Sequence, residues 1–177
     1  MKKLHTVSFL SALSLAALLL TPVTSRAQFT NGSVYLGPEL GLGFGYGGGV
    51  VFGGEIEAPI TNPGTVGSGR LAIAGRFDYW GWSDGLYSYS FIPITAYCKY
   101  HFVINDPNWD IFAGLGVGFA VVSFSYSGEG SGSSGYGGVF ITLDGGVRYF
   151  VSPNVAIRGE LSLLGYLPLA FGVDFKL

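Results

Sequence analysis

The chain has 177 residues and a formal net charge of −2, with 49% hydrophobic and only 11% charged residues. So little positive charge excludes the basic surfaces that bind nucleic acid or anionic membranes. Cys98 is the only cysteine, which excludes an intramolecular disulfide.

Residues 1–27 have the pattern of a secretory signal peptide. Lys2 and Lys3 precede an apolar run over residues 7–20, and the segment ends in Ser25-Arg26-Ala27, with small residues at the two positions that a signal peptidase reads. The run is short for a transmembrane helix, and an uncleaved anchor is the alternative. We predict cleavage after Ala27 and a single domain over residues 28–177.

From residue 33 onward, apolar and polar residues alternate in eight segments that are separated by turn-rich stretches. Because successive side chains of a strand point to opposite faces, each segment predicts a strand with one apolar and one polar face. The predicted strands cover residues 34–46, 50–60, 70–80, 89–102, 109–123, 139–150, 155–163 and 168–177.

The charged residues follow this alternation. Without Lys2, Lys3 and Arg26, 17 of the 20 charged residues remain, and only Asp84, Asp106 and Glu129 of these lie in predicted loops. The other 14 occupy the polar face of a strand: Glu39, Glu55, Glu57, Arg70, Arg76, Asp78, Lys99, Asp110, Asp144, Arg148, Arg158, Glu160, Asp174 and Lys176.

A charge that faces lipid costs ~2–4 kcal/mol at mid-bilayer, and no charge lies on an apolar strand face. Beyond residue 27 the sequence has no apolar run long enough for a transmembrane helix, so a membrane protein of this kind would be a barrel. We therefore predict apolar faces against lipid and polar faces in a lumen. A soluble, lipocalin-like barrel is the architectural alternative, but it would expose its apolar faces to water.

Aromatic residues gather at both ends of the predicted strands. Amphipathic rings prefer the headgroup level, so we expect two girdles at the two membrane boundaries. A general preference of aromatic residues for strands is the alternative explanation. One expected girdle contains Tyr100, Phe102, Trp109, Tyr149 and Phe175, and the other contains Tyr46, Tyr79, Trp80, Trp82, Tyr87, Tyr89, Phe124 and Tyr126.

Residues 92–102, 112–118, 145–150 and 171–177 resemble strands of the small eight-stranded outer-membrane barrels of Gram-negative-type bacteria, which include the OmpA transmembrane domain, OmpX and OmpW-like proteins. The resemblance implies an all-β, antiparallel, up-and-down transmembrane barrel in the cell outer membrane. Both termini would face the periplasm, and the loops near residues 47–49, 81–88, 125–138 and 165–167 would be extracellular.

The same resemblance implies several partners. Outer-membrane lipid would surround the barrel. Independently of the resemblance, we expect the loop at residues 125–138 to contact an extracellular partner and the protein to be a monomer. The barrel assembly machinery would read the terminal strand through Phe171, Val173, Phe175 and Leu177, although Leu177 stands where the family usually ends in Phe.

The lumen of an eight-stranded barrel is just wide enough for side chains, so we expect the inward charges to pair and fill it. We predict a structural or surface-interaction role through the extracellular loops. The alternative is a narrow channel for small solutes or ions, lined by Glu55, Glu57, Arg76, Lys99 and Arg148. The predicted lumen polar network contains Glu39, Glu55, Glu57, Arg70, Arg76, Asp78, Lys99, Asp110, Asp144, Arg148, Arg158 and Glu160.

An outer-membrane lipid-modifying enzyme is the second alternative. His101 lies on the inward face, near Asp110 and Lys99, but no G-x-S-x-G signature accompanies it. We predict no enzyme and no catalytic residue. We also predict no metal site, because His101 and Cys98 lie on opposite strand faces, and no cofactor, because no helix follows the G-x-G-x-x-G match at residues 43–48.

Overall fold

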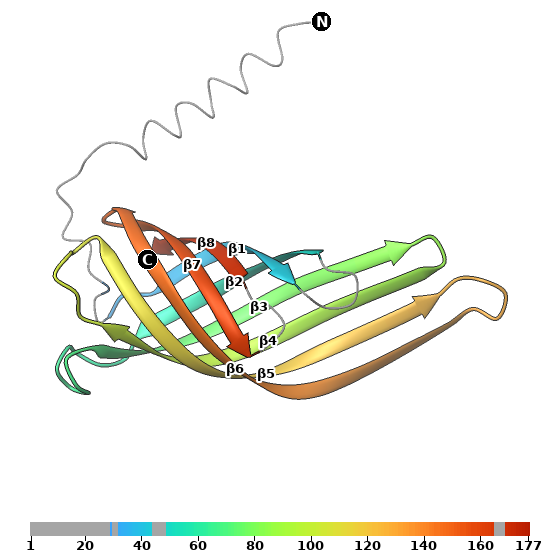
Figure 1. Ribbon diagram of the computed structural model, residues 1–177, viewed down its shortest axis with the longest axis horizontal. Coiled ribbons are helices and arrows are strands. Elements are labelled where there is room, and N and C mark those ends of the chain that lie inside the picture. The colour runs from blue at the N-terminus through green and yellow to red at the C-terminus, as the bar shows by residue number, and fades with distance from the viewer. Residues whose placement is uncertain (1–28, 30–31, 44–48, 165–168) are drawn as a thin grey trace, which may run out of the picture.

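The computed structural model describes residues 29, 32–43, 49–164 and 169–177, so the predicted signal peptide lies outside the described residues. Eight antiparallel strands close into a barrel in chain order (Figure 1), which confirms the predicted fold class. No helix among the residues described is long and apolar enough to cross a membrane. The strands are β1 (Tyr35–Gly43), β2 (Gly49–Pro59), β3 (Arg70–Asp84), β4 (Tyr87–Phe102), β5 (Trp109–Tyr126), β6 (Gly132–Ser152), β7 (Val155–Leu164) and β8 (Leu169–Lys176).

The faces of the strands follow the predicted alternation. In β1, every odd-numbered residue from Tyr35 to Gly43 is buried and every even-numbered residue is exposed. In β8, Phe171 and Phe175 are exposed on the outer surface, whereas Asp174 is buried in the lumen. β8 pairs with β7 on one side and with β1 on the other, so the terminal strand closes the barrel as expected.

The central strands are longer than the alternation predicted. β3 continues to Asp84 and β4 begins at Tyr87, leaving a tight turn in which Gly85 has a φ of +53°. β5 continues to Tyr126 and β6 begins at Gly132. Most of each predicted outer loop, at residues 81–88 and 125–138, therefore lies in strands. Serine and glycine are typical of loops, and for that reason the sequence predicted loops here. The prediction was wrong because these small residues lie on one face of a sheet whose other face is aromatic.

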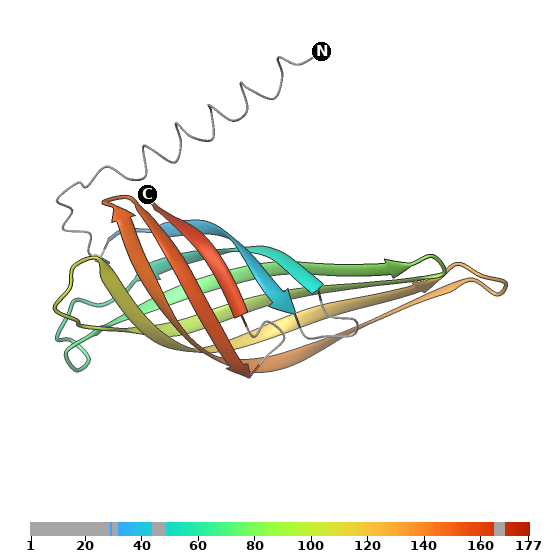
Figure 2. The same cartoon turned by 45° about the horizontal axis from the view of Figure 1, so that its top comes forward.

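These extensions form one projecting sheet, which we call the blade (residues 80–84, 87–91, 122–126 and 132–136). Pairing is continuous across it, from Trp80 opposite Phe91 to Tyr126 opposite Gly132. The two long hairpins run well beyond the short strands β1, β2, β7 and β8 (Figures 1 and 2). We call the blade side the far end of the barrel.

The opposite, terminal end carries the last residue, whose amide donates a hydrogen bond to the Val34 carbonyl oxygen. The predicted outer loops at residues 47–49 and 165–167 lie largely outside the described residues.

Candidate functional site: a filled lumen and an aromatic blade

Near the terminal end, the lumen is organised around Arg148, whose side chain is fully buried. Its guanidinium donates hydrogen bonds to Glu57 at 2.7 Å, to Asp110 at 3.0 Å and to Asp174 at 2.7 Å. His101 joins the same group, with Nε2 2.6 Å from a Glu57 oxygen and Nδ1 2.9 Å from an Asp110 oxygen. This cluster connects β2, β4, β5, β6 and β8 across the lumen.

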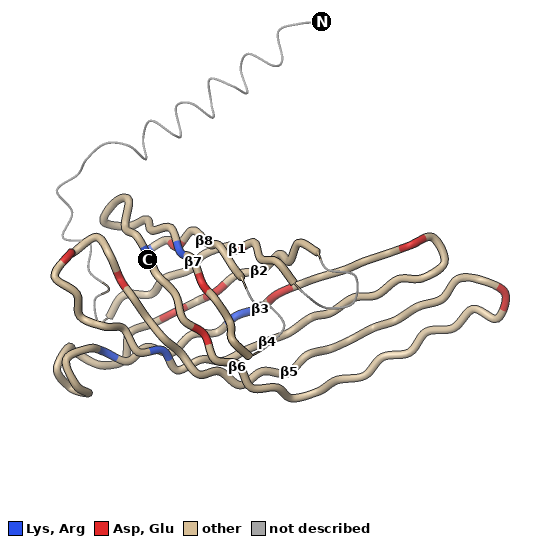
Figure 3. Tube along the Cα trace, viewed as in Figure 1, with Lys and Arg blue, Asp and Glu red and all other residues tan. Residues whose placement is uncertain are grey.

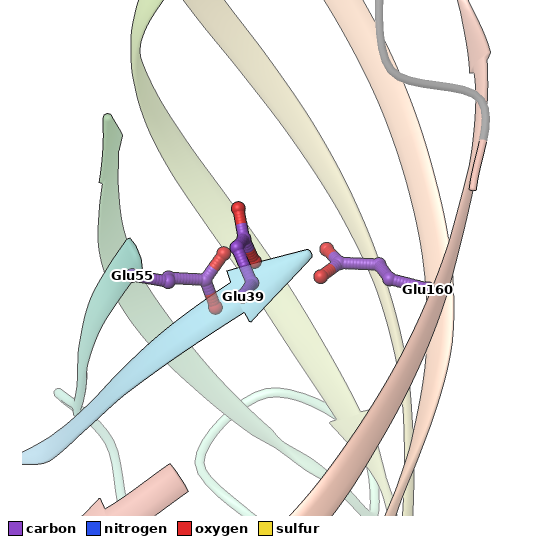
Figure 4. Close-up of side chains that lie close together, drawn as sticks. All are labelled: Glu39, Glu55 and Glu160. Carbon is purple, nitrogen blue, oxygen red and sulfur yellow. The ribbon is translucent and has the colours of Figure 1, made fainter. Parts of the chain in front are cut away.

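In the middle of the lumen, three carboxylates from β1, β2 and β7 converge: Glu39, Glu55 and Glu160 (Figure 4). One oxygen from each carboxylate lies within 4.8 Å of one oxygen from each of the other two, a spacing that a metal ion could bridge. However, each of the six oxygens contacts a cationic nitrogen of Arg76, Lys99 or Arg158. Protein cations therefore hold the position that a metal ion would take.

The two arginines approach the three carboxylates from different strands. Arg76 on β3 lies 2.9 Å from Glu39 and 3.1 Å from Glu55, and it also contacts Glu160. Arg158 on β7 lies 3.0 Å from both Glu39 and Glu55, and 2.6 Å from Glu160. A buried ion pair must offset the desolvation of its charges, and here each carboxylate shares two or three cations. Glu39 Oε1, Glu55 Oε2 and Arg76 Nε make ion-pair contacts without a well-aligned hydrogen bond.

Ten of the twelve residues in the predicted lumen network make ion pairs with one another. Asp144 does so through Arg76, at 3.5 Å. Arg70 is half-buried at the start of β3, and Asp78 is buried beside Gly53; among the residues described, neither makes an ion pair. His101 and Asp174 join the network, and alternation had already placed both in the lumen.

Apolar layers close the lumen at both ends. At the terminal end, the ring of Phe29 stacks on His101 with centroids 3.9 Å apart and on Tyr35 with centroids 4.8 Å apart. At the far end, Trp80 and Phe91 are buried in an apolar cluster. The sequence did not single out these layers, although Trp80 and Phe91 share strand faces with Asp78 and Thr95. The other buried members of the far cluster are Val51, Ala120, Val122 and Ala170.

The blade reverses the chemistry of the two sheet faces. Inside the barrel, the charged side chains point inward and the outward residues are mostly apolar. In the blade, the outer face carries only small residues: Gly81, Ser83, Ser88, Ser90, Ser123, Ser125, Ser133 and Gly135. The inner face carries Trp80, Trp82, Asp84, Tyr87, Tyr89, Phe91, Val122, Phe124, Tyr126, Gly132, Ser134 and Tyr136.

The two predicted girdles therefore differ in outcome. At the terminal end, Trp109 and Tyr149 pair on the outer surface with ring centroids 4.9 Å apart, as a girdle requires. At the far end, Tyr79 points outward, whereas Trp80 closes the lumen and Tyr46 lies outside the described residues. The remaining five, which are Trp82, Tyr87, Tyr89, Phe124 and Tyr126, lie on the inner face of the blade, so the second girdle was wrongly predicted.

The terminal strand presents Phe171, Val173 and Phe175 on the outer surface, and Leu177 is exposed after its end. This placement makes their side chains available to lipid. Their role as an assembly signal stays a prediction.

No family model matches the chain, and no curated protein matches it. Solved structures share its fold. Ail, the attachment invasion locus protein of Yersinia pestis, is 16% identical over 84% of this chain and 100% of its own, with a TM-score of 0.58. The N-terminal barrel of Pseudomonas aeruginosa OprF is 14% identical over 83% of this chain and 98% of its own, with a TM-score of 0.58.

Neisserial surface protein A is 19% identical over 82% of this chain and 96% of its own, with a TM-score of 0.52. Ail is an outer-membrane protein. The chain thus has the fold of the small outer-membrane barrels, and its outer surface is the apolar one that lipid requires. Fold and surface together place it in the cell outer membrane.

Proposed function

We propose that this outer-membrane barrel is a surface-interaction protein, with the blade outside the cell and both termini in the periplasm. The observation that carries the proposal is the blade itself. The outward apolar residues of the barrel form a band, which we call the belt. Four strands continue past the belt as a paired sheet, and rings are exposed on one face of that sheet. Exposed apolar patches on a folded protein commonly mark interaction sites.

The lumen is a structural element in this proposal. Most of its charges pair with one another, and apolar layers lie above and below them. A cavity of about 20 Å³ lies beside Asp78, Thr95 and Tyr97, which is room for a water molecule but not for a solute. These features favour a closed plug over the narrow channel. A planar-bilayer recording is expected to show no steady conductance, and a stable conductance would favour the channel instead.

We also propose that the protein is not an enzyme. His101 is the candidate base, but both of its ring nitrogens contact carboxylate oxygens, and the Phe29 ring covers it. A general base must reach the proton of a nucleophile or substrate, and His101 is committed to Glu57 and Asp110. Lipid turnover by the wild-type barrel that is lost in the His101→Gln variant would contradict this proposal.

The surface role is tested by shortening both hairpins. Replacing residues 82–89 and residues 124–134 each with Asn-Gly closes the hairpins at the pairs Gly81–Ser90 and Ser123–Gly135. Bacteria that display the shortened barrel are compared with bacteria that display the full one for attachment to cultured cells. We expect attachment to fall to the level of bacteria without the barrel. Unchanged attachment, with heat-modifiable gel migration confirming a folded barrel, would refute the proposal.

The ligand of one protein of similar fold can be compared with the chemistry of the blade. Ail has been crystallised with sucrose octasulfate, a heparin analogue. A polyanion of that kind needs cationic side chains. The sequence between Arg76 and Lys99, and between Lys99 and Arg148, contains no lysine or arginine, so the blade offers none. A sulfated glycan is therefore not the partner that we propose.

A further inference from the structure

The inner face of the blade is a continuous aromatic surface. Cross-strand neighbours join its rings, since Trp82 lies opposite Tyr89, which lies opposite Phe124. Tyr87 has its ring centroid 5.0 Å from that of Tyr126 and 5.9 Å from that of Phe124. We call these five residues the aromatic platform.

Much of this platform faces solvent. Trp82 is 41% exposed, Tyr87 44% and Phe124 40%. Trp80, two residues before Trp82 on the same face, is 5% exposed because it packs inside the barrel mouth. The exposed rings are thus not needed to close the lumen.

A carboxylate stands on the same face as the platform. Asp84 is exposed and lies directly opposite Tyr87 across the β3–β4 pair. Glu129 lies in the other hairpin turn, and Figure 3 shows one acidic position near the tip of each long hairpin, with the basic residues confined to the barrel. The far end therefore has negative charge and rings but no lysine or arginine of its own.

Exposed rings beside a carboxylate favour some ligands of the aromatic platform over others. Lipid is disfavoured because the opposite face of the blade consists of serine and glycine, as expected for a sheet in water. A second copy is disfavoured because its far end would bring the same carboxylates and no cation. Rings and carboxylates are instead the groups that hold ammonium and guanidinium ions, through cation–π contacts and ion pairs.

We propose that the aromatic platform, together with Asp84, binds a basic polypeptide segment, stacking arginine or lysine side chains on the rings. The proposal rests on the proposed surface role and specifies the chemistry of the partner. Arginine fits best, because its planar guanidinium stacks on aromatic faces and also pairs with a carboxylate.

The test is calorimetric titration of the full barrel, in zwitterionic phospholipid nanodiscs, with a hexa-arginine peptide. Hexa-glutamate and a Gly-Ser hexapeptide are the control ligands. We expect only hexa-arginine to bind, and its affinity to fall as salt rises, because the charges are exposed. Failure of hexa-arginine to bind, or equal affinity for the Gly-Ser peptide, would overturn the proposal.

Variants locate the site. Trp82→Leu keeps an apolar side chain but removes the ring, and we expect a loss of affinity of about two- to fivefold, with a similar loss for Asp84→Asn. The matched control is the double variant Ser88→Ala and Ser125→Ala, a cross-strand pair on the opposite face of the blade, which should bind like the wild type. Affinity that survives Trp82→Leu and Asp84→Asn combined would place the peptide elsewhere and overturn the assignment.

The two proposals fail in different ways. If hexa-arginine does not bind but the shortened hairpins still abolish attachment, the surface role stands and the basic partner is wrong. If the shortened barrel attaches as well as the full one, the surface role itself fails.

Discussion

The lumen and the blade are two regions of one sheet, and they satisfy their side chains in opposite ways. On β3, Arg76 and Asp78 are buried inward charges, whereas Trp82 on the same face is an exposed ring. Within the belt, water is scarce and each charge needs a protein partner. Beyond it, water solvates the polar face, and rings that no lumen requires can be left for a partner. Depth in the membrane, rather than strand identity, decides the chemistry of a face.

We expect the largest loss of stability from replacing Arg148, which lies in the lumen. Arg148→Met would leave Glu57, Asp110 and Asp174 without their shared cation, and breaking a buried ion pair typically costs ~3–5 kcal/mol. Urea unfolding of the barrel in detergent measures the change. Arg70→Met is the control, since Arg70 is half-buried and lies outside the ion pairs of the described residues; a comparable loss there would contradict a specific role for Arg148.

Two tryptophans on one strand face, Trp80 and Trp82, can be used to locate the boundary between the lumen and the blade. Trp80→Ala would open a cavity in the far apolar layer and should lower the free energy of unfolding by ~3–5 kcal/mol. Trp82→Ala, two residues further out, should change it by less than ~1 kcal/mol, because surface substitutions are nearly neutral. Thermal or urea unfolding distinguishes them. Equal losses would mean that the blade is part of the packed barrel.

The outer surface should show the same boundary. Leu115 lies on the lipid face of β5, midway between the outward residues Trp109 and Val121, so Leu115→Lys should cost ~2–4 kcal/mol. Ser123→Lys, one outward position beyond Val121, should cost less than ~0.5 kcal/mol. Unfolding measured in lipid vesicles gives both values. A large penalty at Ser123 would place the blade surface inside the bilayer.

The smallest effect concerns the seam between the first and last strands. A Cβ on Gly37 would meet the Val173 carbonyl and the Asp174 carboxylate, and overpacking of this kind costs ~1–3 kcal/mol. Gly138→Ala is the matched control, because nothing lies within 4 Å of its added Cβ. Comparing the two urea midpoints tests whether the seam is tightly packed, and a shift that is no larger for Gly37→Ala would show that it is not.

Much of the candidate site could be read from alternation. Glu55, Arg76 and Arg158 were assigned to the lumen because a strand has period two and lipid rejects charge. Which carboxylate pairs with which cation could not be read, since Arg76 and Glu160 are 84 residues apart and meet only across the closed lumen. The far girdle was misplaced because Trp82 and Tyr87 were assigned by their position near strand ends rather than by face.

Eight strands, their inward and outward faces and a terminal strand suited to closing the barrel could be predicted from the order of residues alone. These follow from local alternation and from the cost of a charge in lipid, and both act residue by residue. How far the strands run, and where the aromatic rings beyond the belt are placed, depend on contacts made in the folded barrel. Segments such as residues 81–84 and 132–138 pair because neighbouring strands complete their hydrogen bonds, and those neighbours come from distant parts of the chain.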